Sequence, residues 1–221
     1  MKNIALDHGM ASDSEPLGVR QKDYVVVDDL GDFTYYPSET TMLEDLEYVD
    51  EAASIIDRAG NDYRLTLRGD RNLRLGTPLG RVEFTWLRQA WVNYRRRDPR
   101  THRLLRLYPR TLEVLLAGIF EILTLELASN AGNSPLLSPS LTPWVLDVGG
   151  EETHPATLRD VDGLLAGLEH LELARVCDPF GHNYRPIRHA THIFRAFGAW
   201  PIYYVELDPH RRQVESSDGK P

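Results

Sequence analysis

The residues best suited to chemistry lie in one short stretch near the C-terminus. Imidazole, thiolate and carboxylate groups are the ligands that zinc and iron use, and the same groups serve in acid–base or thiol catalysis. His189 and His192 are three residues apart, so a helix would place both on one side. The stretch therefore predicts a metal site or a hydrolase site. Its members are Cys177, Asp178, His182, His189 and His192.

Known motif spacings do not strengthen this hypothesis. The sequence contains neither an H-E-x-x-H motif nor a pair of C-x-x-C motifs. The alternative is that these histidines are partly buried structural residues.

Gly149-Gly150 is followed by two glutamates, which would repel a phosphate, and no P-loop or dinucleotide fingerprint occurs. We therefore expect no cofactor.

Acidic residues are concentrated in one N-terminal segment. Asp28 to Glu51 contains nine acids and no lysine or arginine, so it carries a charge of −9. Carboxylates along a helix edge would meet a basic protein surface, because complementary charge speeds association and penalises wrong partners. The alternative is a solvated helix face. The partner contacts that we expect are Glu44, Glu47, Asp50 and Glu51.

Arginines are concentrated in a later segment. Arg88 to Arg110 contains eight arginines and one acid, a charge of +7. With its interleaved aromatic residues, this segment could follow a phosphate backbone. Alternatively, the arginines pair with acids of the same chain or cover apolar surface with their stems. The rest of the chain carries −15 and would repel a polyanion. The candidate nucleic-acid contacts are Arg95, Arg96, Arg97, Arg100 and Arg103.

The overall composition is that of a folded water-soluble protein. The 221 residues are 42% hydrophobic and 26% charged, with a net charge of −8, which excludes collagen, a coiled-coil rod and a fully disordered chain. Cys177 is the single cysteine, so no internal disulfide can form. The first 16 residues have no signal-peptide pattern, and no apolar run approaches the roughly 20 residues of a membrane span. We expect a cytoplasmic protein without membrane contact.

The elements that must position these residues follow from hydrophobic periodicity. Short β-branched or alternating runs predict strands at 24–28, 33–36, 54–57 and 62–67, and Leu73 and Leu75 extend the sheet. A helix begins after Ser38 or Thr41 and continues to Val49. Residues 1–22 then form a loose arm and residues 23–76 an acidic ββαββ lobe, which is a small antiparallel sheet with one helix.

The remainder predicts a central helix pair followed by a mixed α/β C-terminal unit. Helices are expected at 82–97 and 109–128 within the central unit 77–128, then a linker at 129–143. The unit 144–210 contains strands at 144–148, 171–177 and 201–207, with helices at 158–168 and 188–197; residues 211–221 form a tail. The fold class is therefore α+β. The expected helical core is Trp86, Trp91, Leu115, Leu116, Ile119 and Leu123.

One segment resembles a known group of proteins. Three motifs carry the resemblance: Tyr36-Pro37-Ser38 before the first helix, the run from Leu43 to Asp50 within it, and Asp57 to Gly60 opening the next hairpin. With these motifs, residues 23–75 resemble small actinobacterial candidate immunity proteins, which occur beside polymorphic toxins. The resemblance implies an acidic, non-catalytic, partner-binding role.

The function that we predict is therefore non-catalytic binding of a basic protein, such as a toxin, in the manner of an immunity protein or antitoxin. The acidic residues would occlude the active cleft of that partner. Two alternatives remain open at this point: a hydrolase or metal enzyme that uses the C-terminal histidine stretch, and nucleic-acid binding through the arginine segment.

Overall fold

The computed structural model describes residues 22–67, 69, 72–107, 109–130, 142–188 and 201–208. Helices and sheets both form within these ranges, so the predicted α+β class is confirmed. The predicted arm (1–22), linker (129–143) and tail (211–221) fall wholly or mainly outside the described residues, as does most of the predicted helix 188–197. Of the described helices, none has the length and apolar character needed to cross a membrane.

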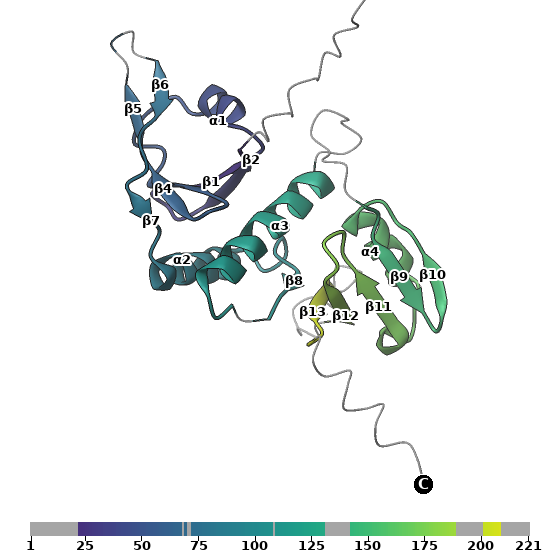
Figure 1. The fold of residues 1–221 in the computed structure, drawn as a ribbon. Helices are drawn as coiled ribbons and strands as arrows, with labels where there is room; N and C mark the ends of the chain where they lie inside the picture. The colour runs from purple at the N-terminus through teal and green to yellow at the C-terminus, as the bar shows by residue number, and fades with distance from the viewer. Residues whose placement is uncertain are drawn as a thin grey trace, which may run out of the picture.

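The N-terminal half forms an antiparallel sheet in the order β2-β1-β3-β4-β7 (Figure 1). Its strands are β1 (Tyr24–Val27), β2 (Phe33–Tyr36), β3 (Ser54–Asp57), β4 (Asn61–Tyr63) and β7 (Gly80–Arg81). The two predicted hairpins, β1–β2 and β3–β4, are confirmed. All four β1 residues are buried because both sheet faces are covered, one by the central helices and the other by α1 (Glu39–Asp45).

The strand predicted at 62–67 is wrong as a single element. Arg64 interrupts it, and β5 (Leu65–Leu67) pairs only with β6 (Leu73–Leu75) in a separate two-stranded ribbon. The returning chain explains the break: the Gly76 amide donates to the Arg64 carbonyl, and Gly80 and Arg81 then pair with β4. Residues 73–75 therefore do not extend the larger sheet.

Two helices cover one face of this sheet. They are α2 (Phe84–Arg97) and α3 (Leu112–Asn130), and α3 runs between the two halves of the molecule (Figure 1). Gly60 allows the close approach of α3, because a Cβ at this position would lie 2.9 Å from Leu116 Cδ1. Five of the six predicted helical core residues are buried. Trp86 is 43% exposed, since the buried face of α2 contains Leu87 and Trp91 and Trp86 points away from that stripe.

The C-terminal half forms a second sheet in the order β10-β9-β11-β12-β13-β8. Its strands are β8 (Leu104–Leu105), β9 (Val145–Val148), β10 (Glu151–Thr153), β11 (Ala174–Cys177), β12 (Asn183–Arg188) and β13 (Ile202–Glu206). β8 comes from the α2–α3 connection and runs parallel to β13, so it joins the central helices to this sheet. Arg188 ends a strand, which contradicts the prediction that it begins a helix.

One face of the second sheet packs against α4 (Leu158–Ala166). α4 begins with a capping box, in which the Thr157 side chain accepts from the Asp160 amide and the Asp160 side chain accepts from the Thr157 amide, and the helix predicted from residue 158 is confirmed. The predicted strand at 171–177 is shorter, because Leu171–Leu173 form a single 3₁₀ turn before β11.

Candidate functional site

The acidic residues lie on a shorter helix than the sequence predicts. α1 ends at Asp45, and Leu46 adopts an extended conformation. Carboxylates near a helix C-terminus oppose the negative end of the helix dipole, and the last turn contains Glu44 and Asp45 without a basic residue. The prediction that the helix reaches Val49 is therefore wrong, and Glu47, Asp50 and Glu51 lie in the loop that leads to β3.

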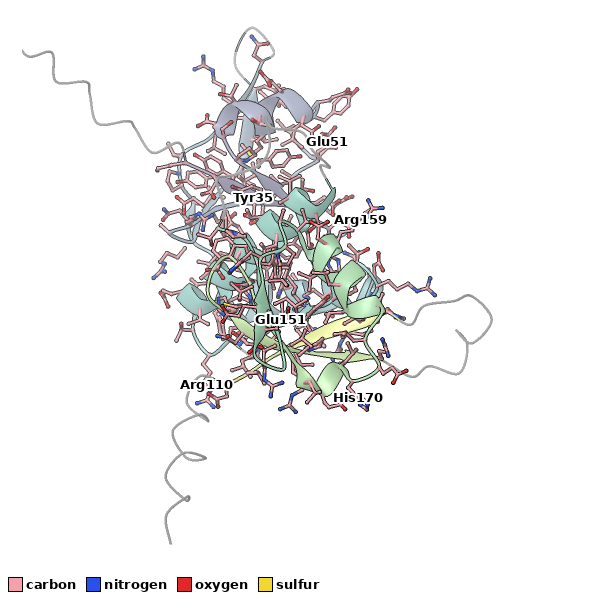
Figure 2. All side chains as sticks on the ribbon, turned by 90° about the vertical axis from the view of Figure 1, so that its right-hand side faces the viewer. Tyr35, Glu51, Arg110, Glu151, Arg159 and His170 are labelled. Atoms are coloured by element: carbon pink, nitrogen blue, oxygen red, sulfur yellow. The ribbon has the colours of Figure 1, made fainter. Side chains whose placement is uncertain are left out.

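This loop and the end of α1 form what we call the acidic surface: Glu44, Glu47, Asp50 and Glu51. Glu44, Glu47 and Asp50 are exposed, whereas Glu51 is half-buried and accepts a hydrogen bond from the Glu47 amide at 3.0 Å. Figure 2 shows Glu51 beside α1, at the opposite end of the molecule from Arg110 and His170. Within the described part of the chain, none of these four carboxylates forms an ion pair.

An aromatic residue stands in the middle of the acidic surface. The Tyr48 side chain is 62% exposed, and the neighbouring Val49 is 38% exposed. Tyrosine is enriched at protein interfaces because its ring provides apolar area and its hydroxyl provides a hydrogen-bonding group. The acidic surface thus combines charge with an exposed anchor residue. Tyr48 is not among the predicted partner contacts, although its position between Glu47 and Asp50 is a local signal.

The arginine segment is largely used inside the molecule. Arg97 donates to Asp32 at 2.5 Å and to the carbonyl of Gly31, which links α2 to the β1–β2 turn. Arg103 makes a two-fold hydrogen bond with Asp162 of α4, both distances being 2.7 Å. Arg95 donates to the carbonyls of His102 and Leu104.

Of the five candidate nucleic-acid contacts, at least three are therefore bonded to intramolecular partners. Arg96 and Arg100 are exposed and lie near the end of α2. Two exposed arginines do not make a track for a phosphate backbone, so the fold gives the nucleic-acid hypothesis less support than the sequence did. The Arg97–Asp32 ion pair joins the arginine segment to the acidic segment.

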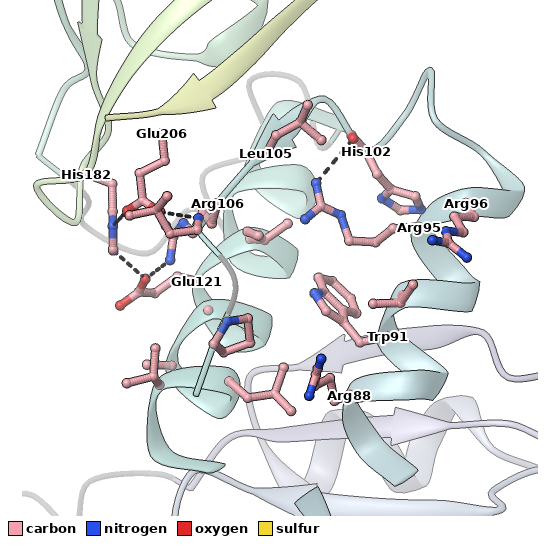
Figure 3. Close-up of a pocket in the computed structure, with 18 of the residues that line it drawn as sticks. Arg88, Trp91, Arg95, Arg96, His102, Leu105, Arg106, Glu121, His182 and Glu206 are labelled. Carbon is pink, nitrogen blue, oxygen red and sulfur yellow. Dashed lines mark hydrogen bonds and ion pairs between the residues drawn. The ribbon is translucent and has the colours of Figure 1, made fainter. Parts of the chain in front are cut away.

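His182 is partly exposed, and both of its ring nitrogens are bonded within a charge network. Its Nδ1 is 2.5 Å from Glu206 Oε1, and its Nε2 is 3.1 Å from Glu121 Oε2. Glu121 also accepts from Arg106 (Figure 3). The other amino group of Arg106 donates to Asp178 at 2.8 Å. The Asp178 side chain is fully buried, and the hydroxyl of Tyr184 donates to it as well. The network therefore joins α3 to β12, β13 and the segment after β8.

The two glutamates determine the charge of His182. Their hydrogen bonds raise the pKa of the His182 imidazole to about 9, although burial acts in the opposite direction. Burial raises the pKa of Glu121, but the bonds from His182 and Arg106 lower it more, and the net direction is down. An imidazolium with both nitrogens bonded to carboxylates cannot bind a metal or accept a proton at neutral pH.

The C-terminal stretch is only partly brought together. Asp178 accepts from the His182 amide at 2.9 Å, but its side chain points into the core toward Arg106. Cys177 is half-buried on the other face of the second sheet, next to Arg175 and Asn183. His189 and His192 lie outside the described residues. Where the structure describes side chains, no three His, Cys, Asp or Glu groups are placed to hold a metal ion.

The sequence analysis missed three members of the network: Arg106, Glu121 and Glu206. A signal was available for Glu121, because a carboxylate within the apolar helix α3 requires a cationic partner. The cationic partners of Glu121 are Arg106 and His182, which lie 15 and 61 residues away in the sequence. Comparison with known proteins adds no assignment: no protein-family model, curated protein or solved structure matches this chain.

Proposed function

We propose that this protein is a non-catalytic binding protein that docks onto a basic protein partner through the acidic surface. The chemistry of the partner follows from the residues: a cationic patch to face the carboxylates, and an apolar or aromatic hollow to receive Tyr48. A toxin whose active cleft binds phosphates has such a patch. The proposal agrees with the resemblance of residues 23–75 to immunity proteins.

One observation carries this proposal. The chain contains 22 arginines, yet in the described residues none of them pairs with Glu44, Glu47, Asp50 or Glu51. Neighbouring acids do find partners: Asp23 pairs with Arg58 and Asp32 with Arg97. The four carboxylates are therefore available to a cationic partner.

The competing functions have weaker support. A metal or acid–base enzyme would need an imidazole nitrogen that is free to bind a metal or a proton, whereas both nitrogens of His182 are bonded to carboxylates. Nucleic-acid binding would need a continuous cationic surface, whereas Arg95, Arg97 and Arg103 are bonded within the fold. The acidic surface combines charge, exposure and an aromatic anchor.

The test is a binding measurement with the basic proteins encoded by neighbouring genes, each purified as an inactive variant. Isothermal titration calorimetry compares the natural protein with a variant in which all four carboxylates of the acidic surface are neutralised: Glu44→Gln, Glu47→Gln, Asp50→Asn and Glu51→Gln. An exposed ion pair contributes about 0.2–1 kcal/mol. We therefore expect binding to weaken by about 1–4 kcal/mol, and the salt dependence of the affinity to fall.

A matched control separates a local effect from the effect of net charge. Neutralising four exposed acids of the second half, Glu151, Glu152, Glu169 and Glu172, changes the net charge by the same amount. This control should leave the affinity nearly unchanged. If the two variants weaken binding equally, or if the first leaves tight binding intact, the acidic surface is not the docking site and the proposal fails.

A further inference from the structure

A cavity of about 800 Å³ lies between α2 and α3. Residues from Pro99 to Leu107 line one side of it, and His182 and Glu206 lie at one end (Figure 3). Tyr203 also lines the cavity. Sites for small molecules in proteins typically have volumes of about 300–1,000 Å³. The cavity is on the opposite side of the molecule's core from α1, so it is separate from the acidic surface.

The wall of this cavity is mainly apolar. Trp91 and Val92 line it from α2, Leu105 from β8, and Val114 and Ile122 from α3. Val114 is 57% exposed, which is unusual for a branched apolar residue on a helix with a buried core face. The two helices thus leave apolar surface facing the cavity instead of closing it.

Gly118 lies on the α3 side of the cavity and has no side chain to fill the space there. It lies in the interior of α3, where glycine costs about 1 kcal/mol relative to alanine. No packing contact within the described residues requires this glycine, because a Cβ at this position would meet no atom within 4 Å. Its effect is to keep space open in the cavity.

The charges around the cavity fall into two groups. At one end, Arg106 and His182 are both bonded to carboxylates, namely Glu121, Glu206 and Asp178, so the cations of that end already have partners within the protein. On the α2 side, Arg95 and Arg96 line the cavity, and neither pairs with a carboxylate in the described part of the chain.

Arg95 is the clearest example of an arginine at the cavity whose hydrogen bonds involve no carboxylate. Its hydrogen bonds go to the backbone carbonyls of His102 and Leu104, and its buried Nε has no hydrogen-bond partner. Burial lowers the pKa of this guanidinium, and the charge of Glu126, which acts in the opposite direction, does not offset the effect of burial. A half-buried arginine normally has a carboxylate or phosphate partner.

We propose that the cavity between α2 and α3 binds an organic carboxylate with an apolar body. The carboxylate accepts hydrogen bonds from Arg95 and Arg96, since a guanidinium matches the geometry of a carboxylate. The apolar body lies against Trp91 and the surface of α3 around Gly118. This site is independent of the acidic surface, and the two proposals can fail separately.

Calorimetric titration of the full chain with four probes tests the chemistry of this ligand. Octanoate and 2-naphthoate have both features, 1-octanol has the apolar body alone, and acetate has the carboxylate alone. Octanoate and 2-naphthoate should bind saturably, and at least about ten-fold more tightly than 1-octanol, because a charge-assisted hydrogen bond contributes about 1.5–3 kcal/mol. Equal affinity for octanoate and 1-octanol, or for octanoate and acetate, would overturn the proposal.

Two variants then locate the site. Arg95→Gln with Arg96→Gln should weaken octanoate binding about ten-fold or more and leave 1-octanol binding unchanged. The control pair, Arg159→Gln with Arg185→Gln, removes the same charge from exposed positions outside the cavity and should have little effect. If both pairs weaken binding equally, the anion is attracted by general charge and the proposed contacts are wrong.

Gly118→Leu keeps the test decisive even if loss of Arg95 disturbs the fold. The added side chain enters open space and removes the helix-interior glycine, so the variant should fold and should lose binding of octanoate and 1-octanol alike. Unchanged binding in this variant would exclude the cavity as the binding site.

Sedimentation velocity on the natural protein and on Gly118→Leu tests whether a second copy of the chain occupies the cavity. If the natural protein is a dimer and Gly118→Leu dissociates it, the cavity is an interface between copies and the ligand proposal is overturned.

Discussion

Arg106 is the centre of the charge network, and its removal should be among the most destabilising substitutions in the chain. Its side chain is 8% exposed and contacts Glu121 of α3 and the fully buried Asp178 after β11. The substitution Arg106→Met preserves much of the side-chain volume while it removes the charge and the hydrogen bonds. Asp178 keeps its bonds from Tyr184 and from the amides of Phe180 and His182, but it loses its cationic partner.

The expected magnitude follows from burial. Breaking a buried ion pair by removing one partner typically costs about 3–5 kcal/mol, because the remaining charge stays buried without compensation. A protein of this kind is stable by about 5–15 kcal/mol, so the loss would be a large fraction of the total. Arg81→Met is the matched control: the Arg81–Glu113 pair is 57% and 66% exposed, and exposed pairs contribute about 0–1 kcal/mol.

Urea unfolding followed by far-UV circular dichroism measures both variants. A double-mutant cycle with Asp178→Asn adds a more specific test. Neutralising Asp178 removes the charge that Arg106→Met leaves uncompensated, so the double variant should lose less stability than the two single losses together, by about 0.5–3 kcal/mol. If Arg106→Met costs no more than Arg81→Met, or if the cycle gives no coupling, the network does not hold the second sheet to α3 as we argue.

Three further predictions test other parts of the structure. The His182 pKa of about 9 exceeds its unfolded value of about 6.5. The stabilisation from its charged form is therefore complete below about pH 6.5 and is lost as the pH rises through 9. Because the side chain is partly exposed, we expect this contribution to the free energy of unfolding to be on the order of 1–2 kcal/mol. The pH dependence in this window should be flatter in His182→Gln. Gly60→Ala should cost about 1–3 kcal/mol, and more than Gly149→Ala, because both glycines have positive φ but only the first would place a Cβ against Leu116. Thr157→Ala removes the cap of α4 and should cost about 0.5–2 kcal/mol in urea unfolding.

Each of these predictions has an outcome that would contradict it. A His182→Gln variant whose stability falls with pH as steeply as that of the natural protein would assign the titration to another group. Equal losses in Gly60→Ala and Gly149→Ala would mean that the approach of α3 does not depend on glycine. An unchanged midpoint for Thr157→Ala would show that α4 is held by its packing alone.

Local signals in the sequence were sufficient for the elements that depend on neighbouring residues. The β1–β2 hairpin, the cap formed by Thr157 and the boundaries of α2 follow from residues within a few positions of one another. The apolar character of α3 also predicted correctly that this helix lies at the centre of the fold. These features needed no knowledge of the tertiary structure, because alternation, helical spacing and capping are local.

Elements that exist only through distant partners were not predictable in the same way. β7 and β8 contain two residues each, and their pairing depends on β4 and β13. Nothing within so short a segment specifies a strand. The early end of α1 is an intermediate case, because the concentration of acids at its C-terminus opposes the helix dipole and the sequence contains that information.

The sequence alone determined that the chain has an acidic segment and an arginine segment, since charge depends only on composition and order. Only the tertiary structure decided how these charges are used. It brought Arg97, Arg103 and Arg106 to acids 15 to 72 residues away, and it left the acidic surface without arginine partners among the described residues. The physical reason is that an ion pair requires two groups within about 4 Å, and the distance between residues remote in the sequence is set by how the helices and sheets pack.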